Sequence, residues 1–277
     1  MRNGRYITEY HCHSTVSPDG HNTMTEMALA AADAGIDELC FTDHVEPLPW
    51  VKWNDAPLAS GSYDWGAMQR QFDEAQRAVG GRIRLRMGAE LGESTLASAT
   101  MDSFLDSAPP LDFTIGSVHA FRVADGTVDD FCWLPGEERA WYDACTHYFN
   151  ELARLVEWGR FHVVGHLTLP RRYAKELHGI ELDLSRYEEQ IRAVLRRVVE
   201  TGHGIELNTN RAHEPLPGEM WLRMYRELGG EIITLGSDAH VPQHLGSAME
   251  RGQELLSHCG FRYFTTFAQG KPEFHKL

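Results

Sequence analysis

Short β-type runs alternate with longer helical segments along almost the whole chain of 277 residues. Runs rich in apolar, β-branched and aromatic residues predict seven strands, at 6–11, 38–42, 83–89, 113–117, 161–165, 204–207 and 231–235. Apolar spacing near 3.6 residues predicts helices at 23–35, 63–78, 141–158, 187–201 and 220–228, the first opening on a capping box from Thr23 to Glu26. Strands separated by helices pair in parallel, so we expect an α/β fold, and the length admits a barrel.

Two stretches lack a clear period, namely residues 46–64, which carry three prolines, and residues 123–138. The alternation resumes unchanged after each of them. This indicates long loops between a strand and a helix and not linkers between domains. We therefore expect residues 1–277 to form a single domain.

Each predicted strand ends in side chains that bind metals or hydrogen-bond substrates. In chain order these are His11 and His13, Asp43 and His44, Glu90, His119, His166, Asn208, and Asp238 with His240. In parallel βα barrels the carboxyl ends of the strands meet at one mouth, which carries the active site. We therefore expect these residues to converge on one site.

A lone histidine beside a strand is more often exposed or hydrogen-bonded within the protein than bound to a ligand. We keep that interpretation for the histidines elsewhere in the chain. At the strand ends, however, histidines recur with acids in the same position, which favours metal binding. In His11-x-His13 the two-residue period of an extended segment places both imidazoles on one face.

Imidazole together with carboxylate suits zinc, manganese or iron better than a metal that prefers sulfur. The candidate ligands are His11, His13, Asp19, His44, Glu90, His119, His166, Asp238 and His240. They are too many for one ion that keeps an open position. We therefore expect a cluster of two or three divalent ions.

The charge balance limits the partners of the chain. Its 26 Lys and Arg against 40 Asp and Glu give a formal net charge of −14, which disfavours nucleic acid or an anionic membrane as the main partner. Small phosphorylated substrates remain possible because bound metal ions invert the local field.

The sequence has no apolar leader and no long apolar stretch, and its five cysteines are scattered. We therefore expect a cytoplasmic protein with free thiols. The sequence leaves its oligomeric state open.

Taken in order, the strand-end motifs resemble those of the PHP family, named for polymerase and histidinol phosphatase. The motifs are His11-x-His13, TDH at 42–44, GAE at 88–90, GSVH at 116–119, GH at 165–166 and GSDAH at 236–240. Within the family, the chain is most similar to the histidinol-phosphatase branch, through STVSPDG at 14–20, GHLTLPRRY at 165–173 and ELNTNR at 206–211. It departs from that branch at Thr168, where the pattern has Asp.

The resemblance implies a distorted (β/α)7 TIM-like barrel with its active site at the carboxyl ends of the strands. It also implies up to three ions, bound by His11, His13, Glu90 and Asp238, by Glu90, His119 and His166, and by Asp19, His44 and His240. Asp43 would support these ligands. A carboxylate at Asp19 favours manganese or iron at the third position. Alternatively, Asp19 only caps the turn before the helix near Thr23.

The implied reaction is hydrolysis of a phosphate monoester, L-histidinol phosphate, to L-histidinol and phosphate in histidine biosynthesis. A hydroxide that bridges the metal ions would attack phosphorus in line. Arg172, Arg211 and Asn208 would bind the substrate. Asp238 or His240 would pass a proton to the leaving alkoxide, two roles that the sequence does not separate.

Several alternatives stay open at this point. Arg171 and Arg172 both follow a proline, and an arginine there is often a surface ion pair; we prefer Arg172 for the phosphate. The substrate could instead be a nucleotide or an oligonucleotide end, although the acidic balance argues against it. A non-catalytic PHP module is a further alternative, but such modules often lose ligands, and all the ligand positions here hold competent residues.

Overall fold

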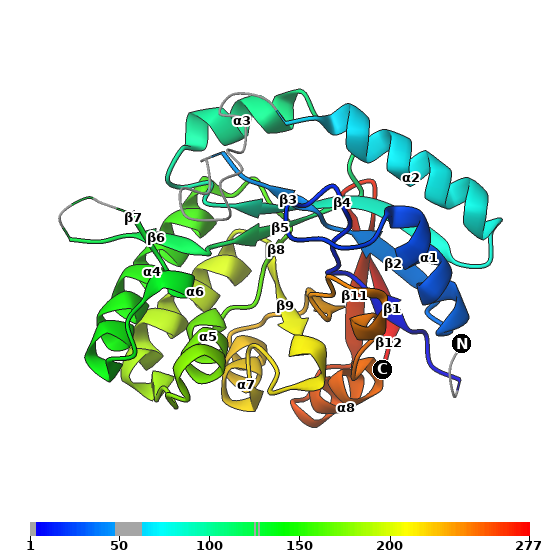
Figure 1. Ribbon diagram of the computed structural model, residues 1–277. Helices are drawn as coiled ribbons and strands as arrows, with labels where there is room; N and C mark the ends of the chain where they lie inside the picture. The colour runs from blue at the N-terminus through cyan, green and yellow to red at the C-terminus, as the bar shows by residue number, and fades with distance from the viewer. Residues whose placement is uncertain (1–3, 48–62, 125, 127) are drawn as a thin grey trace.

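The computed structural model describes residues 4–47, 63–124, 126 and 128–277 (Figure 1). Seven strands form a parallel sheet in the order β1 (Thr8–Glu9), β2 (Glu38–Phe41), β4 (Arg84–Gly92), β5 (Phe113–Ser117), β8 (Val163–Val164), β9 (Gly204–Asn208) and β10 (Ile233–Gly236). A short extra strand, β3 (His44–Val45), pairs in parallel with β4. The first and last strands approach each other, because Tyr10 N donates to Leu235 O over 2.9 Å and His13 N to Ala239 O over 2.8 Å. The predicted parallel, nearly closed α/β barrel is therefore confirmed.

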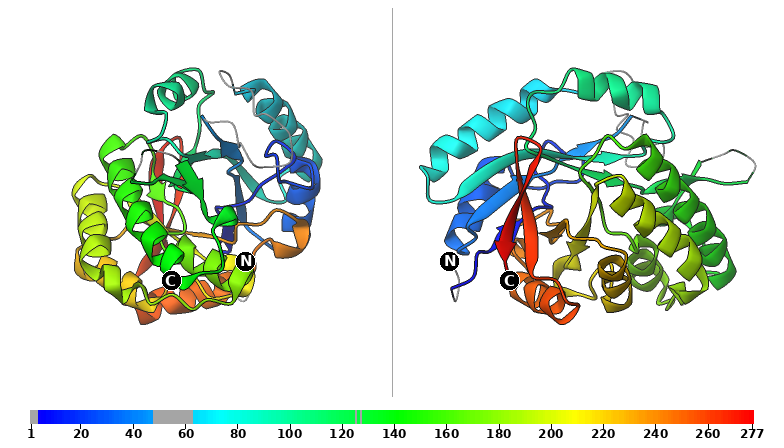
Figure 2. Two further views of the ribbon diagram at one scale, coloured as in Figure 1. Left: turned by 60° about the vertical axis from the view of Figure 1, so that its left-hand side comes forward. Right: turned by 180° about the vertical axis from the view of Figure 1, so that it is seen from behind.

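Helices surround this sheet on several sides, as the two rotated views show (Figure 2). They are α1 (Met24–Asp33), α2 (Trp65–Val79), α3 (Ser98–Asp106), α4 (Glu138–Trp158), α5 (Leu169–His178), α6 (Glu188–Glu200), α7 (Glu219–Glu227) and α8 (Met249–His258). The predicted helices correspond to α1, α2, α4, α6 and α7. The capping box is present, since Thr23 Oγ1 accepts from Glu26 N and the Glu26 carboxylate accepts from Thr23 N.

The structure also contains elements that the pattern did not predict. Helices α3, α5 and α8 are among them, and part of the stretch predicted as a loop at 123–138 is ordered. There, β7 (Val128–Asp130) pairs with β6 (Ala120–Arg122), followed by a 3-10 turn, η1 (Phe131–Trp133). Most of the other predicted loop, 46–64, lies outside the described residues.

A C-terminal hairpin packs against the end of the barrel opposite the ligand-bearing strand ends. It consists of β11 (Tyr263–Ala268) and β12 (Lys271–Lys276), the red strands in Figure 2. Tyr10 Oη accepts a hydrogen bond from Phe267 N over 3.0 Å, and the Phe267 ring lies 5.0 Å from Phe113 between centroids. Phe267 is thereby part of a buried apolar cluster that includes Phe113 and Ile115 of β5.

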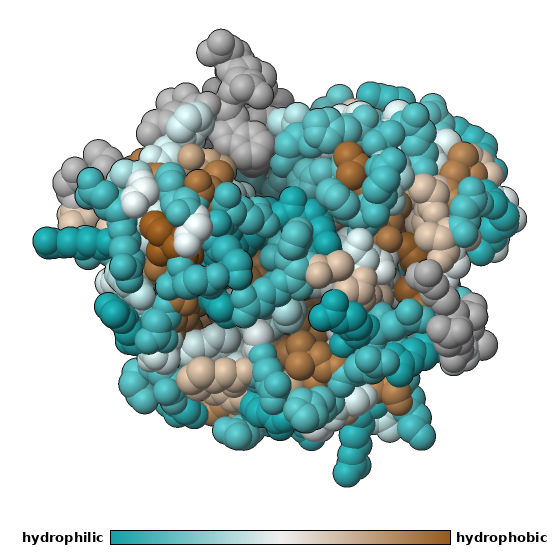
Figure 3. All heavy atoms as spheres, turned by 60° about the horizontal axis from the view of Figure 1, so that its bottom comes forward, coloured by the Kyte–Doolittle hydropathy of each residue, from teal (hydrophilic) through white to brown (hydrophobic). Residues whose placement is uncertain are grey.

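The face that carries α7 and α8 is mostly hydrophilic, and its apolar residues are scattered (Figure 3). All five cysteines are free thiols, as expected. Among the described residues, no helix has the length and apolar character needed to cross a membrane.

Candidate metal centre

The structure brings all nine candidate ligands together at the carboxyl ends of the strands. His11 and His13 follow β1, Glu90 lies in β4, His119 and His166 follow β5 and β8, and Asp238 and His240 follow β10. His44 begins β3, and Asp19 lies in the loop before α1. Their ligand atoms fall into overlapping groups, each compact enough to surround one ion.

The first group contains His11 and His13 with two carboxylates. His11 Nε2 lies 3.2 Å from Glu90 Oε2 and 3.6 Å from Asp238 Oδ1. His13 Nε2 lies 3.4 Å from each of the same two oxygens. Both imidazoles thus face one point between the two acids, as the two-residue spacing predicts.

The second group is built on the other oxygen of Glu90. Glu90 Oε1 lies 3.0 Å from His166 Nε2 and 3.2 Å from His119 Nε2, and these two nitrogens are 3.3 Å apart. Ser117 Oγ also donates to Glu90 Oε1 over 2.6 Å. Glu90 therefore divides its carboxylate between two groups of histidines.

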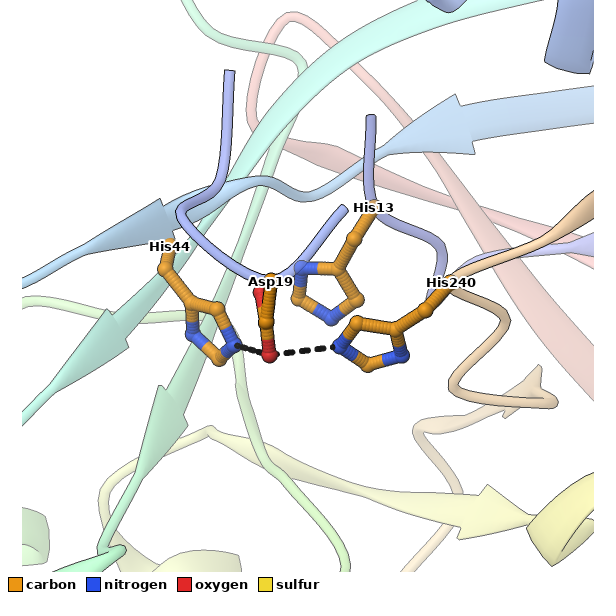
Figure 4. Close-up of side chains that lie close together, drawn as sticks. All are labelled: His13, Asp19, His44 and His240. Atoms are coloured by element: carbon orange, nitrogen blue, oxygen red, sulfur yellow. Dashed lines mark ion pairs between the residues drawn. The ribbon is translucent and has the colours of Figure 1, made fainter. Parts of the chain in front are cut away.

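The third group surrounds Asp19, whose carboxylate points between two imidazoles (Figure 4). Asp19 Oδ2 lies 3.0 Å from His240 Nε2 and 3.6 Å from His44 Nε2. The His13 ring stacks on the same side, 4.2 Å from His240 and 4.3 Å from His44 between centroids. Asp19 Oδ1 has no hydrogen-bond partner among the described residues and Oδ2 faces the two imidazoles, so the alternative that Asp19 only caps the turn before α1 finds no support.

Divalent ions fit this arrangement of donors. His11 Nε2, His13 Nε2 and Glu90 Oε2 are buried and have no hydrogen-bond partner among the described residues, yet they face one another. Ligand atoms about 2.0–2.1 Å from a tetrahedral zinc lie roughly 3.3 Å apart, close to the separations found here. Facing lone pairs repel each other, and a cation between them removes that repulsion.

The charges of the cluster also favour a bound cation. Burial opposes protonation of His11, but Glu206 and Glu90 outweigh it and raise its pKa well above the ordinary value. Burial likewise opposes ionisation of Asp238, but Arg172 and His11 hold its pKa well below its usual range. The carboxylates thus remain charged and draw cations toward them. A divalent ion supplies that charge without protonating the ligands.

Hydrogen bonds at the Nδ1 atoms orient the imidazoles of His11 and His13. His11 Nδ1 lies 2.7 Å from Glu206 Oε1, and Glu206 Oε2 accepts from His166 N over 2.8 Å. His13 Nδ1 lies 3.1 Å from Ser17 Oγ, which donates to Asp43 Oδ1 over 2.8 Å. Such partners fix the tautomer of a ligating histidine. The supporting role expected for Asp43 therefore acts through Ser17.

Three buried acids beside the centre were not predicted: Glu46, Glu93 and Glu206. Glu46 follows His44 at a spacing of two, the same signal that paired His11 with His13. Glu206 lies one residue before the end of the strand predicted at 204–207 and could have been found from that position. Glu93 Oε1 accepts from the backbone of His119 and Ala120 over 2.7 and 2.9 Å, a contact that no sequence pattern indicates.

Of the two arginines expected to bind substrate, Arg172 contacts Asp238, and Arg211 lies nearby, its backbone N–H donating to Ser237 O over 3.3 Å. The Arg172 guanidinium donates to Asp238 Oδ2, and its buried Nε has no hydrogen-bond partner among the described residues, with Glu176 Oε2 3.9 Å away. Arg211 donates to Glu176 over 2.9 Å, whereas Arg171 pairs with Glu214 over 2.8 Å. Together they line a cavity of about 380 Å³ between α5 and the turn η3 (Asn210–Ala212).

Asn208 is held within the protein. Its amide nitrogen donates to Glu206 Oε2 over 3.2 Å, and its amide oxygen accepts from Asn210 N over 2.8 Å. These contacts support Glu206 and the turn that carries Arg211, and contact of Asn208 with substrate stays a prediction. Arg211 itself has a positive φ of 53°, a conformation that non-glycine residues adopt mainly where the surroundings impose it.

Comparison with known protein families matches residues 9–210 to the PHP domain. The chain belongs to the PHP family. A histidinol-phosphatase from Lactococcus lactis is 25% identical over 276 residues, covering 97% of each chain. A probable histidinol-phosphatase from Thermotoga maritima is 27% identical over 259 residues, covering 93% of this chain and 94% of the relative.

Two solved structures share the fold. The crystal structure of the histidinol phosphate phosphatase from Lactococcus lactis, complexed with zinc, L-histidinol and phosphate, superposes with a TM-score of 0.77 at 22% identity. The match covers 96% of this PHP chain and 98% of the other. A second neighbour, from Listeria monocytogenes, has a TM-score of 0.73 at 18% identity, with 88% and 99% covered.

Proposed function

We propose that the protein hydrolyses L-histidinol phosphate to L-histidinol and phosphate, using two or three divalent transition-metal ions. The observation that carries this proposal is the set of buried, mutually facing donors from six strand ends, with Arg172 beside them. Curated relatives that match over nearly the full length of the chain are histidinol-phosphatases, which supports this substrate. The whole chain would act as one cytoplasmic enzyme.

The metal ligands that we propose are those of the three groups. His11, His13, Glu90 and Asp238 would hold one ion, Glu90, His119 and His166 a second, and Asp19, His44 and His240 a third. When bound, such ions lower the pKa of water and neutralise charge on a phosphoryl group. Zinc, manganese and iron all suit this donor set.

The protein's own residues would position the substrate and move the proton. Arg172 is nearly buried and its pKa is raised, since Asp238 outweighs the effect of burial, so its charge is permanent. Its buried Nε can donate to a phosphate oxygen, and Arg211 can add a second donor once it leaves Glu176. Neutralising the phosphoryl oxygens in this way favours attack at phosphorus.

His240 is the better placed of the two candidate proton donors. Its side chain is 24% exposed, against 8% for Asp238, so it is the more accessible of the two from solvent. Asp238 is already occupied by Arg172 and by its contacts with His11 and His13. We therefore assign delivery of a proton to the leaving alkoxide to His240 in the enzyme that holds two ions. When a third ion takes its Nε2, the one remaining N–H of the ring, at Nδ1, lies 3.1 Å from the carbonyl oxygen of Asp238 and cannot serve this role.

A phosphate-release assay tests this function. The purified, metal-loaded protein should hydrolyse histidinol phosphate with a kcat/KM at least about a hundredfold above that for AMP or glucose phosphate, a gap of roughly 2.7 kcal/mol in transition-state binding. A chelator should abolish the activity, and added manganese or zinc should restore it. Comparable rates with a nucleotide would instead support the alternative of a nucleotide phosphoesterase.

A further inference from the structure

Glu46 is a buried acid beside the proposed metal centre. It directly follows β3, two residues after His44, and its side chain is only 2% exposed. Neither carboxylate oxygen has a hydrogen-bond partner among the described residues. A buried, unsatisfied carboxylate costs free energy unless something pairs with it. The fold nonetheless keeps room for this group, since a Cβ added at Gly92 would lie 2.2 Å from Glu46 Oε1.

The same Glu46 oxygen faces two imidazoles. Glu46 Oε1 lies 3.4 Å from His44 Nδ1 and 3.6 Å from His119 Nδ1. The other ring nitrogens of these histidines point to different metal groups, His44 Nε2 toward Asp19 and His119 Nε2 toward Glu90. Glu46 therefore lies behind two proposed ligands, His44 of the third group and His119 of the second.

A neutral imidazole has one lone pair and one N–H proton. If Nε2 of each ring binds its ion, Nδ1 must carry the proton and needs an acceptor. A ligating histidine usually donates this proton to a carboxylate, a carbonyl or water. For the same reason, Glu46 and the two Nδ1 atoms cannot hold an additional ion while both Nε2 atoms are ligands.

Neighbouring acids are less free to accept these protons. Glu93 Oε1, 3.7 Å from His119 Nδ1, already accepts two backbone N–H groups. Glu90 Oε2 lies 3.1 Å from His44 Nδ1, but it also faces His11 Nε2 and His13 Nε2 as a candidate ligand atom. Neither oxygen of Glu46 accepts a hydrogen bond from the backbone of the described residues, although its carboxylate also faces the Glu93 carboxyl, whose pKa is raised by burial and by Glu46.

We propose that Glu46 is a positioning residue that accepts hydrogen bonds from His44 Nδ1 and His119 Nδ1 and so orients ligands of two different ions. This inference rests on the metal centre proposed above. It assigns Glu46 a role in metal affinity at two sites at once, without direct coordination. Glu206, which contacts His11 Nδ1 over 2.7 Å, provides a natural comparison at the remaining site.

The test is manganese binding to the chelator-treated full chain, measured by equilibrium dialysis with elemental analysis. Glu46→Gln keeps the shape and removes the charge, and should weaken the two ions served by His44 and His119 about tenfold to a hundredfold. The ion held by His11 and His13 should bind as in the wild type. Glu206→Gln should instead weaken the ion held by His11 and, through the backbone of His166, the second ion, but not the ion served by His44. Glu38→Gln, a change at a buried acid remote from the centre, should leave all ions in place.

Double variants test whether Glu46 serves both rings. Glu46→Gln should still weaken manganese binding in a His119→Ala background and also in a His44→Ala background, because each leaves one of its two partners. Loss of the effect in either background would overturn the shared role. Unchanged binding in Glu46→Gln would overturn the proposal, as would complete loss of one ion with the others unaffected, which would make Glu46 a direct ligand.

Two further measurements separate this role from a purely structural one. Gly92→Ala should displace the Glu46 carboxylate without changing any charge and should reproduce the loss of manganese affinity. The rise in melting temperature on adding manganese should be smaller for Glu46→Gln than for the wild type, each compared with its own chelated protein. A lower melting temperature of the chelated Glu46→Gln protein, combined with an unchanged rise on adding manganese, would contradict the proposal. Wild-type protein that binds no manganese tightly would contradict the metal centre itself.

Discussion

Glu90 and His166 are in contact through a single carboxylate oxygen: Glu90 Oε1 lies 3.0 Å from His166 Nε2, while Oε2 faces His11 and His13. One side chain in β4 thus reaches two groups of imidazoles. A carboxylate can do this because its two oxygens accept independently. Glu90 is therefore the residue whose loss should disturb the centre most widely.

Replacing Glu90 should affect two ions, and replacing His119 mainly one. Elemental analysis of Glu90→Ala, purified without chelators, should show about two fewer ions per chain than the wild type when three are present. His119→Ala should lose about one, since it contacts only the second group. His258→Ala, an exposed histidine on α8, serves as the control and should keep the wild-type content. Equal losses in Glu90→Ala and His119→Ala would refute the bridging role of Glu90.

Arg172 should matter more for phosphate recognition than its neighbour Arg171. Arg172 is 11% exposed and contacts Asp238, whereas Arg171 is 27% exposed and paired with Glu214. Arg172→Lys keeps the charge but loses the planar fork that binds two phosphate oxygens. It should lower kcat/KM for histidinol phosphate roughly tenfold to a hundredfold, as expected for one charged hydrogen bond.

Arg171→Lys is the matched control and should change kcat/KM less than about threefold. Inhibition by inorganic phosphate provides a second measurement, and it should weaken in Arg172→Lys alone. The assignment of Arg172 fails if Arg171→Lys proves the more damaging of the two.

The sequence could predict the barrel and the convergence of its ligands for the same reason. Alternating strand and helix patterns determine a parallel sheet, and the carboxyl ends of parallel strands meet at one edge. Once the strand at 83–89 is recognised, Glu90 must lie at the mouth with His119 and His166. Asp19 is different, because it lies in a loop and its position followed only from the family resemblance.

Other features were out of reach because they depend on packing between distant segments. Glu93 contacts the backbone beyond β5, and nothing in its own surroundings in the sequence distinguishes it from a solvated acid. Helix α5 begins three residues after His166 and has few apolar residues, three of which are buried, namely Leu169, Pro170 and Ala174. The strand β12 is largely exposed, so it lacks the apolar alternation that identifies a half-buried strand.

His162 should make the folded protein sensitive to acid. Its Nδ1 accepts a hydrogen bond from Thr114 N over 2.9 Å, and its ring lies 4.9 Å from that of Phe267. Burial, with a contribution from His203, lowers the pKa of His162 to about 4. Its unfolded pKa is about 6.5, so the unfolded chain binds the proton more readily. The stabilisation is complete above pH 6.5 and is lost progressively as the pH falls toward 4.

His162→Asn keeps an acceptor near Thr114 N and removes the titrating ring. Urea unfolding at pH 7, 5 and 4 should therefore show a smaller loss of stability on acidification than in the wild type, by at most about 3 kcal/mol. His258→Asn, a change at an exposed position, should follow the wild-type curve. Parallel curves for His162→Asn and the wild type would show that this ring does not control acid stability.

Asp19 should set the metal preference of the third site. Its carboxylate lies between His44 and His240, 3.6 and 3.0 Å from their Nε2 atoms (Figure 4), and it contributes a hard, charged oxygen. Asp19→His replaces this oxygen with a softer, neutral nitrogen, so activation of the metal-stripped enzyme should shift toward zinc and away from manganese and iron. Folding should be retained, because Thr23 caps α1 without help from Asp19.

Phosphate release measured across the three added metals checks the shift. The matched variant is Asp19→Asn, which keeps the oxygen but removes the charge. It should weaken manganese activation without favouring zinc, because the neutral oxygen is a poorer ligand but still a hard one. If both variants keep the wild-type order of metals and lose only thermal stability, Asp19 acts on the turn before α1 and not on an ion.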